Sequence, residues 1–401
     1  MSNVLILPGS RWQKALLNKV RELGHRAMVV SPEQCPPCRE GEVAFFQSDI
    51  FDIEKIVEFC RIQNVEAIVS DECDIAIPVV AELGKRLGLH TIDRDVARLY
   101  TDKFLMREFC RMHGLKYPEY RFCQRADDAV SLLKELGRPI IIKPLDSNAS
   151  HGVFTVESES DIRRHFEEAR SYSRREGAVL AERYIKGTEF TIDGIKTPKQ
   201  HFTLAISEKK HFEHNKNIAY ELFFTHKSDR FDYDRLRRVN NRFVLESGLK
   251  YGFTHAEYKY EEGEYYLIEI GARGGGNEIS SLITQYMSGY DTYRYLVDCA
   301  LGNIYEKDFF IQPEYMDRAA VLHFFKTPRG GGKVQAVHGE DFLKSTPGIL
   351  DYDLRFKIGE CIEDAVNDSA RIGFYIAGKD SVSELHSFME EVNKRFYIEL
   401  E

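Results

Sequence analysis

Short apolar runs alternate with amphipathic stretches through the first ninety residues of the chain. The apolar runs at residues 4–7, 27–30 and 67–69 are separated by segments such as residues 16–23, in which apolar side chains recur at helical spacing. Strands that alternate with helices are typical of a parallel sheet with crossover helices, so we predict half of a doubly wound, Rossmann-like sheet. The turn at residues 8–10 reads Pro-Gly-Ser and lacks the GxGxxG that seats a dinucleotide, which disfavours a nicotinamide or flavin enzyme.

The pattern changes after residue 101, where strand-like runs outnumber helices. We predict helices over residues 103–113 and 129–136, each followed by a glycine, and a third helix near residues 236–243. The runs that predict strands lie at residues 139–144, 153–156, 178–182, 190–193, 202–206 and 218–224, and a hairpin follows over 253–270. These runs indicate a mixed or antiparallel sheet with few helices between its strands.

A C-terminal unit begins after Gly302. It contains predicted strands at residues 319–325, 333–337 and 372–377, and its last helix has a capping box made by Ser381 and Glu384. We therefore expect an α/β protein in which the middle and last parts are of α+β type. The predicted domains are residues 1–98, 99–302 and 303–401.

The overall charge and the cysteines exclude several classes of protein. A formal charge of -9 and a pI of about 5.9 give no basic face for nucleic acid, so we expect no nucleic-acid partner. The sequence has no apolar run of membrane-spanning length and no basic segment before its first apolar run, so we expect a cytoplasmic protein. Cys35 and Cys38 form one CxxC without a second pair, which indicates incidental reduced thiols rather than a zinc or redox site.

Two acidic residues of the predicted hairpin carry the sharpest chemical signal. Gly263 lies midway between Glu257 and Glu269, so a three- or five-residue turn centred there places the two carboxylates opposite each other on one face. Like charges in such a pair are destabilising unless water or a cation separates them. Because Glu269 belongs to the apolar run at residues 266–270, we expect a bound cation, and Mg²⁺ suits these oxygen ligands. The alternative is a solvated hairpin with scattered acids.

Three basic residues are candidates for binding an anion. Arg273 follows the hairpin in a glycine-rich connection, where its planar guanidinium can stabilise charge on a phosphoryl group or a tetrahedral intermediate. Lys103 begins a helix, and Lys143 ends the apolar strand at residues 140–144. The loop after Lys143 is rich in small residues and can fold over phosphates with its backbone amides. Its candidate residues are Ser147, Ser150 and Gly152.

A further segment is suited to a nucleoside. An edge strand can hydrogen-bond an adenine at Glu182, Arg183, Tyr184 and Ile185. Glu189 follows as an acid for ribose hydroxyls. Each of these residues taken singly is equally compatible with a structural role.

The order of these candidate residues along the chain resembles that of the ATP-grasp superfamily, including L-amino acid ligases and proteins similar to carbamoyl-phosphate synthase and biotin carboxylase. The residues that carry the resemblance are Lys103, Lys143 with its loop, residues 182–185, Glu189, Glu257, Glu269 and Arg273. The resemblance covers residues 101–280. It implies ATP bound between two subdomains, with both lysines on the phosphates, Glu182 and Ile185 at adenine, and Glu189 at ribose. It also implies that Glu257 and Glu269 bridge Mg²⁺ to phosphate and that Arg273 steadies an acyl phosphate.

The resemblance implies an ATP-dependent ligase that activates a carboxylate as an acyl phosphate and couples it to an amine. Gly271 replaces an asparagine found in many members, which leaves the third metal ligand open and favours an amino acid or peptide-like substrate. The alternatives are a purine-pathway ligase resembling glycinamide ribonucleotide synthetase, a phosphotransferase, and a nucleotide-binding subunit without turnover.

The partners implied are ATP and small-molecule carboxylate and amine substrates, with no membrane. A basic and aromatic segment at residues 207–230 either faces these substrates or is a solvated loop. An acyl carrier protein stays open as a partner, and a homodimer is the commonest default for such an enzyme.

Overall fold

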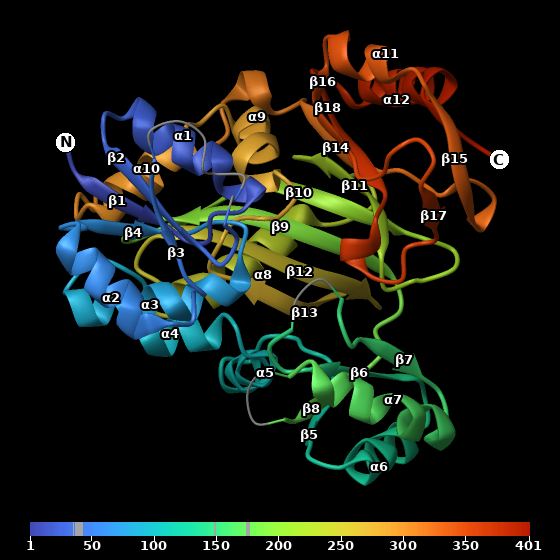
Figure 1. The fold of residues 1–401 in the computed structure, drawn as a ribbon. Coiled ribbons are helices and arrows are strands. Elements are labelled where there is room, and N and C mark those ends of the chain that lie inside the picture. Colours follow the sequence, from blue (N-terminus) through green and yellow to red (C-terminus); the bar gives the residue numbers. More distant parts are fainter. Residues whose placement is uncertain (35, 37–42, 148–149, 174–176) are drawn as a thin grey trace.

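The computed structural model describes residues 1–401 except 35, 37–42, 148–149 and 174–176 (Figure 1). The CxxC motif of Cys35 and Cys38 lies outside the described residues. Three groups of elements can be distinguished in the figure: an N-terminal unit in blue, a small lobe in teal and green, and a large sheet that continues into the C-terminal unit in red. No helix in the described part of the chain is both long enough and apolar enough to span a membrane.

The N-terminal unit contains the parallel sheet that the sequence predicted. Its strands β1 (Asn3–Ile6), β2 (Arg26–Ser31), β3 (Ala44–Gln47) and β4 (Ala67–Val69) lie in the order β3-β2-β1-β4. Helices α1 (Lys14–Glu22), α2 (Ile53–Ile62) and α3 (Ile77–Leu87) cross between them. Val4 and Ile6 of β1 pack in one apolar core and Leu5 in another, so both faces of the sheet are buried. Two helices, α4 (Arg94–Leu99) and α5 (Lys103–Met112), lead to the lobe.

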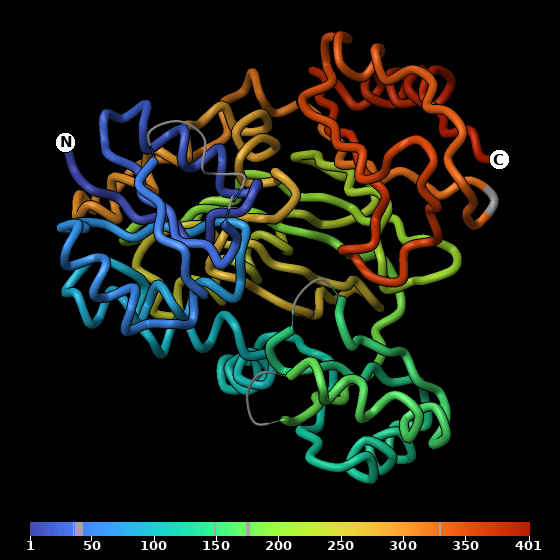
Figure 2. The backbone as a smooth tube through the Cα atoms, viewed as in Figure 1, coloured from blue at the N-terminus to red at the C-terminus, as the bar shows by residue number. Residues whose placement is uncertain are grey.

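The small lobe is an antiparallel sheet with two helices on one face. Its strands β5 (Tyr120–Cys123), β6 (Ile140–Pro144), β7 (Phe154–Val156) and β8 (Val179–Arg183) lie in the order β5-β8-β6-β7. Helix α6 (Ala126–Leu136) ends at Gly137 as predicted. Helix α7 (Glu159–Ser171) was not predicted, because it buries only Ile162, Phe166 and Ala169 among otherwise charged residues. Figure 2 shows this lobe extending below the other two units.

The large sheet has eight strands in the order β13-β12-β9-β10-β11-β14-β18-β16, with antiparallel neighbours. Its first five members are β9 (Thr188–Lys196), β10 (His201–His211), β11 (Ala219–Thr225), β12 (Gly252–Glu261) and β13 (Glu264–Gly271). The others are β14 (Ala319–Phe324), β16 (Ile349–Leu354) and β18 (Gly373–Lys379). One continuous sheet therefore spans residues before and after Gly302.

Helices and a smaller sheet complete the molecule. Helices α8 (Tyr233–Glu246), α9 (Thr284–Ser288) and α10 (Thr292–Ala300) lie before Gly302, and a π-helical turn (Ile279–Ile283) precedes α9. Beyond Gly302, β15 (Gly331–His338) pairs with β17 (Cys361–Glu363) and β19 (Tyr397–Leu400), next to α11 (Glu340–Ser345) and α12 (Val382–Arg395). Ser381 caps α12 by accepting the backbone N–H of Glu384.

Candidate functional site

A β-bulge brings Glu257 and Glu269 opposite each other in the β12–β13 hairpin. The turn has two residues, Glu262 and Gly263, both with positive φ, so the predicted three- or five-residue turn is wrong. With that turn alone, regular pairing would set Glu257 against Ile268. The register shifts by one residue at Ile268, and Glu257 pairs with Glu269.

The central strands β12, β9 and β10 have one apolar face and one polar face. Alternate residues such as Phe190, Ile192 and Ala256 belong to the apolar core. The residues between them face the other way and include several of the predicted site residues. Across the three strands these polar residues are His255, Glu257, Lys259, Glu189, Thr191, Asp193, Ser207 and Lys209.

Lys209 lies between two of the predicted site residues. Its ammonium group donates to Glu189 Oε1 at 2.7 Å and to Glu257 Oε1 at 2.6 Å, and the side chain is almost completely buried. Burial alone raises the pKa of Glu257, but Lys209 and His255 together outweigh burial and lower that pKa below its ordinary value. Sequence reasoning missed Lys209, because the predicted strand ended at residue 206 whereas β10 continues to His211. Residues 207–211 are therefore strand and not a solvated loop.

Lys103 connects Glu269 to the loop of the small lobe. Its Nζ donates to Glu269 Oε1 at 2.8 Å and to the backbone oxygen of Ser147 at 2.7 Å. The lysine begins α5, whose N-terminus is capped by the Asp102 carboxylate. Each of the two opposed carboxylates thus has a lysine partner. Glu257 pairs with Lys209 of the sheet, and Glu269 pairs with Lys103 of helix α5.

Lys143 and Glu182 meet inside the small lobe. Glu182 accepts from Lys143 at 2.7 Å and from Arg107 of α5 at 2.6 Å, and all three side chains are buried. Burial raises the pKa of Glu182, but the two cations lower it below its ordinary value, and burial lowers the pKa of Lys143. Arg107 also donates to the backbone oxygen of the bulge residue Ile268 at 2.5 Å. Arg107 was not recognised from the sequence.

The remaining residues predicted at the nucleoside lie beside this group, but the prediction of an edge strand is wrong, because β8 pairs with both β5 and β6. Arg183 forms ion pairs with Glu119 and Glu261, both at 2.5 Å. Lys259 lies over the ring of Tyr184, and Ile185 is buried. The Arg183 side chain therefore fastens the lobe to the tip of the hairpin.

Part of the predicted phosphate loop touches the C-terminal unit. Ser147 Oγ donates to the backbone oxygen of His151 at 3.0 Å. Ser150, which has a φ of +57°, donates to Asp368 at 2.8 Å. A side-chain carbon at Gly152 would lie 2.8 Å from the ring of Tyr172, so a larger residue does not fit there.

Arg273 forms a two-pronged ion pair with Asp74, which follows β4 of the N-terminal unit. Its Nε lies 2.8 Å from Asp74 Oδ1, and its Nη2 lies 2.7 Å from Asp74 Oδ2. Burial disfavours the charged guanidinium, but Asp74, Glu269 and Glu257 raise the pKa of Arg273. Arg273 therefore lies in the field of the opposed carboxylates while it contacts the N-terminal unit.

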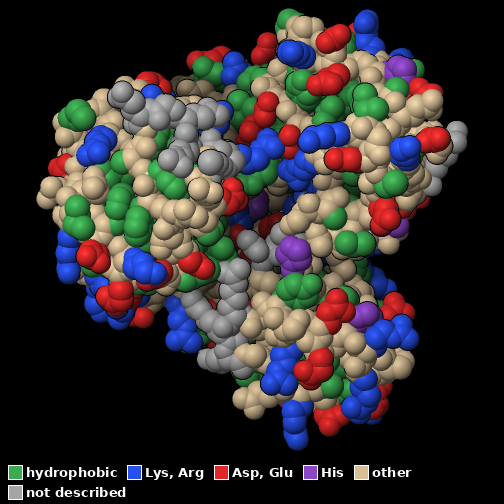
Figure 3. All heavy atoms as spheres, in the orientation of Figure 1, with side chains coloured by type: hydrophobic (Ala, Val, Ile, Leu, Met, Phe, Trp, Pro, Cys, Tyr) green, Lys and Arg blue, Asp and Glu red, His purple; other side chains and the backbone are tan. Residues whose placement is uncertain are grey.

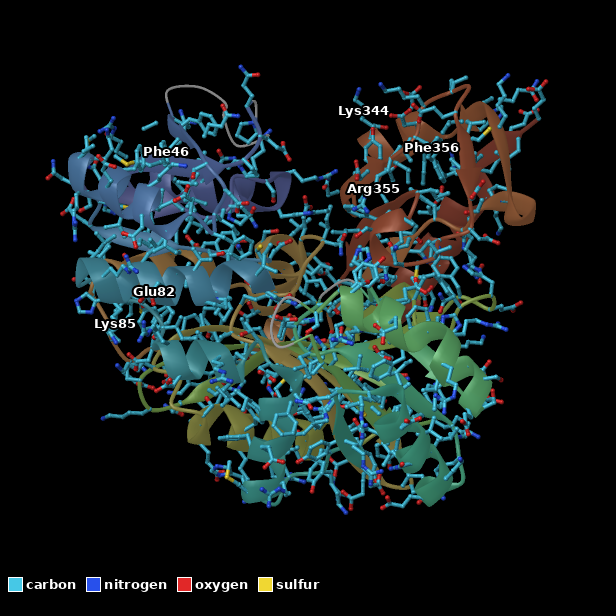
Figure 4. All side chains as sticks on the ribbon, turned by 60° about the horizontal axis from the view of Figure 1, so that its bottom comes forward. Phe46, Glu82, Lys85, Lys344, Arg355 and Phe356 are labelled. Atoms are coloured by element: carbon cyan, nitrogen blue, oxygen red, sulfur yellow. The ribbon has the colours of Figure 1, made fainter. Side chains whose placement is uncertain are left out.

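A group of mixed charge lies between the N-terminal and C-terminal units. Arg11 and Arg355 both bind Asp353, at 2.6 and 2.9 Å, and Arg355 reaches Asn277 at 3.3 Å. Burial and the neighbouring carboxyl of Asp351 raise the pKa of Glu278 to about 8. Figure 3 shows a hollow here in which acidic and basic side chains gather, and Figure 4 shows Arg355 on the margin of the C-terminal unit that faces the N-terminal unit.

The donor set at the hairpin suits a divalent cation that completes its coordination from a ligand. Within the described residues, no group of three or more His, Cys, Asp or Glu side chains could hold a metal. Two opposed carboxylates supply hard oxygen atoms, which Mg²⁺ prefers together with water and phosphate oxygens.

Two family models match the chain. Residues 136–281 match the ATP-grasp domain, and residues 324–401 match the L-amino acid ligase C-terminal domain 2. Dapdiamide A synthase of Enterobacter agglomerans is 22% identical over 297 residues, which cover 73% of this chain and 70% of that protein. Phosphoribosylamine–glycine ligase of Pyrococcus abyssi is 29% identical over 198 residues, 47% of this chain and 44% of that protein, so the match spans less than half of that relative. The crystal structure of an L-amino acid ligase from Bacillus licheniformis superposes over 100% of this chain and 99% of that chain, with a TM-score of 0.81 and 18% identity.

Proposed function

Because this chain belongs to the ATP-grasp superfamily of carboxylate–amine ligases, we propose that it uses ATP to convert a carboxylate into an acyl phosphate and then joins the acyl group to an amine. The observation that carries the proposal is the pairing of Glu257 with Glu269 on the polar face of the large sheet, beside Lys103, Lys209 and Arg273. A pair of acids surrounded by cations is suited to a divalent ion and a polyphosphate held together.

Glu257 and Glu269 would hold Mg²⁺, which when bound neutralises phosphate oxygens and supports phosphoryl transfer. Lys103 and Lys143 would bind the phosphates, since both are buried cations beside the loop at residues 145–152. The substrate carboxylate attacks the terminal phosphorus in line and ADP leaves. The geometry of Lys209 supports one further role, because its charge holds Glu257 in the ionised form that a metal ligand requires.

The nucleoside would lie against the end of β8. The Glu182 carboxylate is already bound by Arg107 and Lys143, so adenine would be recognised by those backbone groups of residues 182–185 that are not already paired. The N–H groups of Arg183 and Tyr184 are paired, since they donate to the backbone oxygens of Glu119 and Pro139. Ser147, Ser150 and Gly152 would lie along the phosphates, and the Glu189 carboxylate would accept hydrogen bonds from the ribose hydroxyls.

Arg273 would act in the second step, in which an amine attacks the acyl phosphate. Negative charge develops on the acyl oxygen, and a half-buried guanidinium held in place stabilises that charge without reorganising. An amino acid or peptide-like substrate is supported by the two matches to amino acid and dapdiamide ligases. It also fits the mixed charge of Arg11, Asp353 and Arg355, because an amino acid carries both signs.

Product analysis tests the proposal. The protein is incubated with ATP, Mg²⁺ and pairs of amino acids, with hydroxy acids as controls, and nucleotides and condensed products are measured by mass spectrometry. ADP, inorganic phosphate and an amide are expected. AMP and pyrophosphate would show adenylation instead, and ADP with a phosphoester would show a phosphotransferase.

A purine-pathway ligase is the second candidate, favoured by the match to phosphoribosylamine–glycine ligase over 198 residues of the chain. The C-terminal match to an L-amino acid ligase domain argues against it. Glycine with phosphoribosylamine as the amine distinguishes the two, since only a purine-pathway enzyme forms glycinamide ribonucleotide from that pair.

A further inference from the structure

An acidic segment of the N-terminal unit fastens the connection that carries Arg273. Asp71 accepts the backbone N–H of Gly274 at 2.6 Å, and Glu72 accepts the backbone N–H of Glu278 at 3.1 Å. Asp74 binds the Arg273 side chain itself through two bonds of 2.8 and 2.7 Å. Backbone and side chain of the connection are therefore both held by residues that follow β4, about 200 positions earlier in the sequence.

The contact with Asp74 fixes the orientation of the guanidinium. The Asp74 carboxylate accepts hydrogen bonds from Nε and Nη2 along one edge of the guanidinium, and Nη1 donates to the backbone oxygen of Gly274 at 2.9 Å. A guanidinium has five N–H groups, so within the described residues these three bonds leave N–H groups for a ligand. The two-pronged geometry restricts rotation of the Arg273 side chain, and the partial burial of both partners strengthens the attraction.

Gly271 provides the room that Asp74 occupies. A side-chain carbon built at residue 271 would lie 2.9 Å from Asp74 Oδ1 and 3.3 Å from Arg273 Nε. The backbone at Gly271 is not in the left-handed region, so its conformation does not require glycine. The close approach of Asp74 therefore accounts for glycine at this position, where many members of the superfamily have asparagine.

We propose that Asp74 is a positioning residue, which holds one edge of Arg273 so that the opposite edge meets the reacting acyl phosphate, and that Gly271 is required to admit Asp74. This inference rests on the proposed role of Arg273. Asp74 does not contact the nucleotide side of the site in this scheme, so its loss changes turnover and leaves nucleotide binding unchanged.

Asp74→Asn tests the inference, because asparagine has the same shape but pairs with only one nitrogen of the guanidinium. We expect kcat for amide formation to fall about 100-fold, as for a catalytic group displaced by about 1 Å, while the KM for ATP and the affinity for Mg-ADP stay within twofold of wild type. An unchanged kcat would overturn the inference, and so would an increased kcat, which would show that Asp74 restrains Arg273 from its substrate. A purely structural role would lower nucleotide affinity and thermal stability together with kcat.

A double-mutant cycle tests the part played by Gly271. Gly271→Ala should reproduce the loss of kcat in the wild-type background and have little further effect in Asp74→Ala, where the carboxylate that it displaces is absent. Gly276→Ala is the matched control in the same connection, since an added carbon there meets no atom within 4 Å, and it should keep wild-type stability and kcat. Full additivity of the two losses would refute the inference. If the wild-type protein itself forms no amide, the proposed function fails instead, so the two failures are distinguishable.

Discussion

Replacing Arg107 by methionine should destabilise the protein far more than the same change at Arg111 of the same helix. The Arg107 and Glu182 side chains are 0% and 3% exposed and 2.6 Å apart, whereas the Arg111 and Glu108 side chains are 55% and 28% exposed at the same distance. Breaking a buried ion pair costs about 3–5 kcal/mol, because the remaining charge loses its partner in a poorly solvated site. An exposed pair contributes about 0–1 kcal/mol.

Two further contacts determine how much stability Arg107→Met loses within the range given for a buried ion pair. Lys143 still neutralises Glu182 in the variant, which lowers the loss. The partly buried backbone oxygen of Ile268 loses its donor, which adds less than the about 1–3 kcal/mol that a fully buried unsatisfied acceptor costs. We therefore expect a loss of about 4 kcal/mol for Arg107→Met and under about 1 kcal/mol for Arg111→Met.

The assay is urea unfolding at pH 7, followed by circular dichroism, with both variants and wild type compared at equal concentration. A difference of less than about 1 kcal/mol between the two variants would refute the reasoning. That result would mean that Glu182 does not depend on Arg107 for its charge. If Arg107→Met does not fold at all, Arg107→Lys, which keeps the charge but not the second contact, should recover part of the stability.

Three other predictions follow from the site. Glu269→Ala should abolish Mg²⁺-dependent ADP release while the circular dichroism spectrum stays that of wild type, and retained turnover would refute the metal assignment. Lys209→Met should lower the free energy of unfolding by about 3 kcal/mol in urea, because Glu189 and Glu257 lose their shared cation; an unchanged value would show that they do not depend on it. Because the pKa of Glu278 is raised to about 8, its protonated carboxyl contributes to the free energy of unfolding, and this contribution is complete below about pH 4.5 and is lost as the pH rises through 8. Glu278→Gln should therefore be more stable than wild type by on the order of 2 kcal/mol at pH 9 and about equal at pH 4; equal stability at pH 9 would contradict this.

The predictions from sequence succeeded where one local pattern decides the structure. The parallel sheet followed from apolar runs at strand spacing, and α6 followed from its period and from Gly137. The pairing of Glu257 with Glu269 was predicted for the wrong reason, since the two-residue turn requires the extra residue Ile268 to bring them opposite. A bulge leaves no local signal, because it depends on contacts such as that between Arg107 and the Ile268 backbone.

The residues that sequence reasoning missed are partners across long distances in the chain. Asp74 and Arg273 are 199 positions apart, and Arg107 and Glu182 are 75 apart. Composition and spacing do not report such pairs, because they form only when separate elements pack together. One indication was available, since the acids of the Asp71-Glu72-Cys73-Asp74 run directly follow a strand of a parallel sheet, at the edge where ligands of such sheets bind.

The continuity of the large sheet limits how the protein can be divided. β11 pairs with β14 from Glu221 opposite His323 to Phe224 opposite Ala320. A fragment ending at Gly302 would therefore expose the backbone N–H and C=O groups of β11 along an open edge, and such edges pair with other chains. Expression of residues 1–302 alone is therefore expected to yield aggregates, because β14 from the last hundred residues covers this edge of the large sheet.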